Sequence, residues 1–150
     1  MKHFLSVMLT MFICASYNVA QAANNSTQEN FNYVFRACIS AIYETDDFAD
    51  VMRKGNDDVI EIRRQDCWRL EESIGVLSQQ IAKGAESRTC ALETRVMLQS
   101  RGLALGYYLD AMNAYRAGNV GLYDEYGRRM AKAWNEAEKD RQNFRNKYGY

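Results

Sequence analysis

The sequence of 150 residues contains no proline and only one histidine, His3. Proline interrupts helices because it lacks a backbone N–H and its ring clashes with the preceding turn, so long helices are unobstructed here. No apolar run approaches the roughly 18 residues that a membrane-spanning helix needs. Gly55, Gly84 and Gly118 separate long segments at the places where helices commonly end. The chain is therefore expected to form long helices and to be soluble once mature.

The first 22 residues have the pattern of a secretory signal peptide. A cationic start is followed by an apolar run from Phe4 to Ala15 and by the small-x-small sequence of residues 20–22. Cys14 is preceded by bulky residues rather than a small one, so lipid attachment at Cys14 is not expected. We predict that residues 1–22 are cleaved, that Ala23 becomes the N-terminus, and that residues 23–150 form a single periplasmic or secreted domain.

Most catalytic chemistries are excluded by what remains after cleavage. Removal of Lys2 leaves a net charge of −1, which attracts neither nucleic acid nor an anionic membrane. With His3 gone, histidine-dependent triads, dyads, haem ligation and zinc sites are excluded. The three remaining cysteines lack Cys-x-x-Cys spacing and are one short of a four-thiolate metal site. We expect no cofactor, no metal and no enzyme activity, although carboxylate-only catalysis is still chemically open.

Apolar periodicity predicts an all-α, up-and-down bundle of about four helices. The segments are 26–54, with a break near residues 44–47 where the apolar stripe changes phase, then 57–83, 88–117 and 120–147. The third segment is apolar over most of its circumference, so it is expected to be the central helix. A narrow stripe on this segment holds Gly102 and Gly106, which would let a neighbouring helix approach closely.

Cys38 and Cys67 lie in the apolar stripes of the first two segments, and an oxidising compartment would allow them to pair. We predict a Cys38–Cys67 disulfide, in preference to Cys67–Cys90 or to three buried thiols. Cys90 would then be left over. It would be either buried or available for a bridge between two copies, which makes a homodimer through Cys90 possible.

Arg63 occupies a position in its helix where an apolar residue would be expected, between Ile60 and Leu70. A desolvated guanidinium needs a carboxylate, and Glu93 or the acidic group at residues 44–50 could supply one. The alternative is that its aliphatic stem packs while its charged head reaches water. The same acidic group lacks the ligand alternation and central glycine of a calcium loop.

Aromatic side chains are the best candidates for binding a partner. Trp68 faces away from the apolar stripe of its helix, so it is either covered by another element or exposed for a partner. Several tyrosines flank the turn at residues 118–121, where they either complete the core or form an interface. The candidates are Trp68, Tyr107, Tyr108, Tyr115 and Tyr123.

Residues 36–43, Arg-Ala-Cys-Ile-Ser-Ala-Ile-Tyr, resemble the first helix of periplasmic immunity proteins that neutralise type VI secretion amidase toxins. The second cysteine motif of that family is not evident nearer the C-terminus, so no family is assigned. We expect a non-enzymatic protein that binds another protein, such as an inhibitor, immunity factor, adaptor or chaperone-like subunit. The alternative is a structural or assembly component of an envelope or secretion machine.

Overall fold

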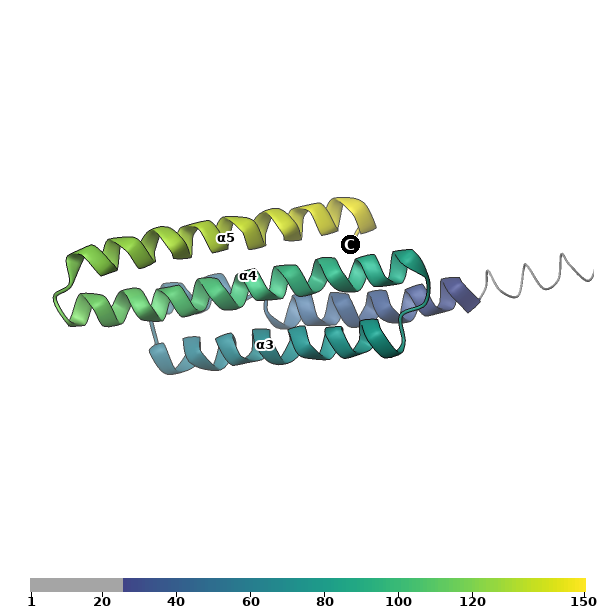
Figure 1. Ribbon diagram of the computed structural model, residues 1–150, viewed down its shortest axis with the longest axis horizontal. Coiled ribbons are helices and arrows are strands. Elements are labelled where there is room, and N and C mark those ends of the chain that lie inside the picture. Colours follow the sequence, from purple (N-terminus) through teal and green to yellow (C-terminus); the bar gives the residue numbers. More distant parts are fainter. Residues whose placement is uncertain (1–25) are drawn as a thin grey trace, which may run out of the picture.

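The computed structural model describes residues 26–150, so the predicted signal peptide and the predicted N-terminus Ala23 lie outside the described residues. The first helix occupies residues 26–44 of this part and a turn follows at residues 45–47. The remaining helices are α2 (Phe48–Lys54), α3 (Asp57–Gln80), α4 (Gly84–Arg116) and α5 (Val120–Tyr148) (Figure 1). The predicted all-α fold and the break in the first predicted helix are confirmed. None of the described helices is long and apolar enough to span a membrane.

The helices follow one another in alternating directions. The first helix and α2 run the same way, α3 returns, α4 runs parallel to the first helix, and α5 returns again (Figure 1). The helix α4 contacts α2, α3 and α5, and α3 and α5 lie on opposite sides of it. It is the central helix, as the sequence predicts.

Two of the predicted helix ends differ from the structure by more than one residue. Helix α3 ends at Gln80 rather than residue 83, and α4 begins at Gly84 rather than residue 88. The cause is Asn30 in the first helix, whose side-chain oxygen accepts hydrogen bonds from the Lys83 backbone N–H at 2.7 Å and from the Ser87 hydroxyl at 3.2 Å. Ser87 therefore binds the first helix and does not cap α4.

The core has two apolar clusters, one packed against the first helix and the other packed against α2. The first joins the first helix to α3, α4 and the C-terminal part of α5, and it includes Val34, Ile42, Ile74, Leu98 and Phe144. The second lies under α2 and includes Phe48, Met52, Ile60, Cys67 and Leu105. Because α2 continues in the direction of the first helix, each cluster packs against a different stretch of α3 and α4.

Arg101 of α4 holds the break between the two clusters. Its side chain is fully buried, and Nη1 donates to the Ile42 carbonyl at 2.9 Å and to the Thr45 hydroxyl at 2.6 Å. Nη2 donates to Asp46 at 2.7 Å, and the guanidinium stacks over the Phe48 ring. Burial lowers the pKa of Arg101, and the nearby Asp46 carboxylate opposes that shift. Arg101 thus donates to the Thr45 hydroxyl and adds a shorter hydrogen bond to the Ile42 carbonyl, which also accepts from the Thr45 N–H at 3.3 Å where the helix is interrupted.

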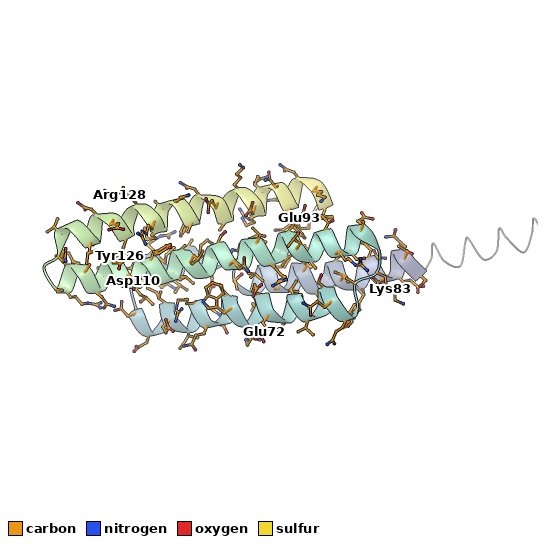
Figure 2. The ribbon with its side chains drawn as sticks, viewed as in Figure 1. Glu72, Lys83, Glu93, Asp110, Tyr126 and Arg128 are labelled. Carbon is orange, nitrogen blue, oxygen red and sulfur yellow. The ribbon has the colours of Figure 1, made fainter. Side chains whose placement is uncertain are left out.

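Sequence reasoning selected Arg63 and passed over Arg101. Arg63 pairs with Asp47 at 2.8 Å and with Asp66 at 3.2 Å, and its side chain is 31% exposed. The predicted carboxylate is thus one of the acidic group at the break. Glu93, which is labelled on α4 in Figure 2, instead accepts hydrogen bonds from Lys147 and Tyr148 at the end of α5. A charged residue between buried Met97 and Leu105 was the signal that could have identified Arg101.

The predicted Cys38–Cys67 disulfide is wrong for this structure, in which Cys38, Cys67 and Cys90 are all free thiols and fully buried. The prediction paired cysteines on consecutive helices and left out the length of α2. Cys67 lies in the cluster under α2, whereas Cys38 and Cys90 share the other cluster. A homodimer bridged through Cys90 would need that sulfur at the surface, and the structure buries it.

Candidate partner-binding site

The turn between α4 and α5 projects beyond the beginning of α3 (Figure 1). Gly118 has a φ of +70°, and its N–H bonds the Tyr115 carbonyl at 2.9 Å while the Asn119 N–H bonds the Ala114 carbonyl at 2.9 Å. This pair of bonds is the Schellman ending of a helix, which suits glycine at the left-handed position. The Asn119 side chain then accepts from the Leu122 N–H at 3.1 Å and caps α5. The turn is short and its backbone hydrogen bonds are satisfied.

Apolar side chains are exposed on this rigid turn. Tyr115 is 65% exposed, Val120 69% and Tyr123 39%. The rings of Tyr115 and Tyr123 lie against each other with centroids 5.7 Å apart. Together with Gly118, Val120 and Asp124 they line an apolar pocket of about 290 Å³. We call Tyr115, Val120, Leu122 and Tyr123 the aromatic tip.

Some of the charged groups beside the aromatic tip form ion pairs and one does not. Arg116 pairs with Asp57 at the beginning of α3 at 2.5 Å, and Arg129 pairs with Glu125. Asp124, at the edge of the pocket, forms no ion pair among the described residues, so its carboxylate faces solvent. The pocket is thus an apolar surface with one negative charge at its rim.

Two of the predicted tyrosines belong to the body of the bundle rather than to the tip. Tyr107 is half-buried, with the Arg129 guanidinium 5.9 Å from the centre of its ring. Tyr108 packs against the second core cluster, and its hydroxyl lies near Gly55 at the end of α2. The structure therefore brings Tyr115 and Tyr123 together and separates Tyr107 and Tyr108 from them.

Trp68, which the sequence left as either covered by another element or exposed for a partner, is half-buried against α4. A Cβ atom on Gly102 would lie 3.2 Å from Cε2 of Trp68, so the indole rests on the glycine. The covering element is α4 and not the break in the first helix. Trp68 is accordingly a packing residue whose outer edge reaches the surface.

The chemistry available at the tip is apolar contact, hydrogen bonding by phenol groups and attraction of a cation. Among residues 26–150 there is no group of three or more histidine, cysteine or acidic side chains placed to hold a metal ion. Comparison with known protein families, with curated proteins and with solved structures finds no match.

Val120 and Leu122 were missed by the sequence reasoning, which searched for aromatic residues alone. The signal was present, because Val120 directly follows the cap residue Asn119 and lies off the apolar stripe of its helix. Apolar residues of α4 are also exposed beside α5, at Leu92, Val96 and Leu103. Near its end, α5 borders Leu92 and Val96 and encloses with them a pocket of about 280 Å³.

Proposed function

We propose that this chain is an exported, non-enzymatic protein that binds another protein through the aromatic tip. The observation that carries the proposal is the exposure of Tyr115, Val120 and Tyr123 on a turn whose backbone is held by a Schellman ending and a side-chain cap. A rigid aromatic anchor loses little conformational entropy when it binds, so such side chains dominate many interfaces.

The proposed partner presents an apolar side chain to the pocket and a lysine or arginine to Asp124. Burying a side chain of valine or leucine size contributes about 1.5–3 kcal/mol. Burying Tyr115 and Tyr123 against the partner's surface adds further binding free energy. Asp124 at the rim would mainly favour the correct orientation and speed the encounter, because an exposed charge pair contributes little to affinity.

Site-specific photocrosslinking in the cells that make the protein tests the proposal. A photoreactive phenylalanine derivative replaces Val120 at the tip, and in a matched control it replaces Asn135, which is exposed further along α5. We expect one discrete protein adduct from position 120 and none from position 135. The intact mass of the exported protein tests the export step, and its N-terminus should be Ala23.

The protein identified by the adduct then allows affinity to be measured. Tyr115→Ala should weaken binding by about 30-fold, which corresponds to about 2 kcal/mol at an interface anchor. Identical adducts from positions 120 and 135, or an affinity unchanged by Tyr115→Ala, would count against the aromatic tip as the binding site.

A second candidate function, assembly into an envelope or secretion machine, is favoured by the exposed row Leu92, Val96 and Leu103 on α4. A second copy or another subunit packing along this row would bury it. Sedimentation at increasing concentration separates the two functions. A monomer at all concentrations fits the binding protein, whereas multimers that Val96→Glu abolishes fit the assembly component.

A further inference from the structure

The first helix is held against α4 at both of its ends, and this fixes the register between the two helices. Near its beginning, Asn30 accepts a hydrogen bond from Ser87, and at its end the Ile42 carbonyl accepts one from Arg101. The partners are 57 and 59 residues apart in the sequence. Because the two helices run in parallel with this nearly constant offset, Cys38 lies opposite roughly residues 95–97 of α4, beside Thr94 and within about two helical turns of Cys90.

The side chains of Cys38 and Cys90 meet within this interface. Both are fully buried in the same apolar cluster between the first helix and α4, and the two thiol groups lie close enough for each to shift the pKa of the other. The hydrogen bond from Cys90 lowers the pKa of the Cys38 thiol, and the same contact together with burial raises the pKa of Cys90. Two thiols in direct contact between two helices are the arrangement from which a disulfide can close.

Cys67 is too far away to compete. It lies against Gly102, where an added Cβ would be 3.4 Å from the Cβ of Cys67. Gly102 is twelve residues along α4 from Cys90, or about 18 Å at the rise of an α-helix. A disulfide requires Cα atoms within about 7 Å of each other, so Cys67 reaches neither of the other two cysteines.

We propose that Cys38 and Cys90 form an intrachain disulfide when a disulfide oxidant of the glutathione class is present, and that Cys67 stays a thiol. One cysteine thiolate attacks the oxidant and releases its first thiol, forming a mixed disulfide. The second cysteine thiolate then attacks the protein sulfur of that mixed disulfide and releases the second thiol. The protein loses two electrons and two protons, and the oxidised glutathione becomes two reduced molecules.

Burial of both sulfurs sets the order of these events. The oxidant cannot reach Cys38 or Cys90 once the first helix lies against α4, because neither side chain is exposed. The mixed disulfide therefore forms before the helices close, and folding brings the second thiol to it. The bond then ties the first helix to the central helix and closes a loop of roughly 50 residues, which restricts the unfolded chain.

Refolding followed by peptide mapping tests the proposal. The chain as isolated is reduced, denatured and refolded in mixed reduced and oxidised glutathione, and its remaining thiols are alkylated. Trypsin places the three cysteines on separate peptides, 37–53, 65–69 and 89–95. We expect peptides 37–53 and 89–95 to be joined, with peptide 65–69 alkylated. The oxidised form should melt roughly 10 °C above the reduced form.

Single substitutions provide the controls. Cys67→Ser should retain the joined peptides, whereas Cys38→Ser and Cys90→Ser should each lose them. The map of the unsubstituted chain decides the matter even if a variant folds poorly. Linkage of 65–69 to either other peptide, or three alkylated cysteines after refolding, would overturn the assignment.

Discussion

Replacing Arg101 by alanine should destabilise the protein far more than replacing Arg63, although both arginines pair with aspartates of the same turn. Arg101 binds Asp46 at 2.7 Å with its side chain 1% exposed, whereas Arg63 binds Asp47 at 2.8 Å with its side chain 31% exposed. The two ion pairs are nearly equal in length. They differ in how much water reaches them, and Arg101 also contacts the buried Ile42 carbonyl, the Thr45 hydroxyl and the Phe48 ring.

The magnitude follows from the groups that Arg101→Ala leaves behind. The Thr45 hydroxyl oxygen loses its donor, at about 1–3 kcal/mol for a buried group left unsatisfied, whereas the Ile42 carbonyl keeps its longer hydrogen bonds from Thr45 and loses less. Loss of the stacking on Phe48 and the cavity left by the side chain add to this. The substitution also removes the free-energy cost of burying the Arg101 guanidinium, whose Nε has no hydrogen-bond partner, and this offsets part of the lost stability. Asp46 can return to water, so we expect a net loss of about 3–5 kcal/mol.

Urea unfolding at constant temperature, with reductant present so that all variants keep free thiols, measures both free energies of unfolding. Arg63→Ala should cost no more than about 1 kcal/mol, as exposed ion pairs do. Arg101→Met restores volume without donors, and it should still lose about 2 kcal/mol because the buried Thr45 oxygen stays without a donor and the Ile42 carbonyl loses its shortest hydrogen bond. Equal losses for Arg101→Ala and Arg63→Ala would refute the reasoning, and full recovery by Arg101→Met would show that volume alone matters.

Two further predictions concern α4 and the second core cluster. Gly106→Ala should stabilise the protein by about 0.5–1 kcal/mol, because it removes a helical glycine and the new Cβ is 3.5 Å from the nearest side-chain atom. Gly102→Ala should stabilise it less, or destabilise it, because its new Cβ would lie 3.2 Å from Trp68. Equal gains in urea unfolding would contradict the packing of Trp68 on Gly102. Burial raises the pKa of Cys67 from 9.0 to about 12. Between these two pH values the Cys67 thiol stays protonated in the folded chain and ionises in the unfolded chain. The free energy of unfolding therefore falls as the pH rises from about 9 to about 12. Between about pH 8 and about pH 10 the free energy of unfolding of the unsubstituted protein should fall by about 1.4 kcal/mol more than that of Cys67→Ala. If the two free energies of unfolding change in parallel with pH, Cys67 does not titrate as described.

The sequence by itself determined the helical class, the break near residues 44–47 and the central place of α4. These properties depend on local features: the period of apolar residues, the change of phase in the first stripe, and glycines such as Gly55 and Gly118 at helix ends. It also directed attention to Tyr115 and Tyr123, because aromatic residues beside a tight turn are close to each other whatever the rest of the fold does.

Only the tertiary structure decided which distant residues meet. The contact between Cys38 and Cys90 depends on how far the first helix is shifted along α4, whereas α2 continues beyond the first helix and Cys67 lies in the cluster under α2. Arg101 and Trp68 were likewise placed by helix register, since the interrupted helix supplies acceptors for Arg101 and Gly102 supplies room for Trp68. Apolar periodicity identifies which face of a helix is buried. It does not set how far one helix slides along another, because that is fixed by side chains far apart in the sequence fitting together.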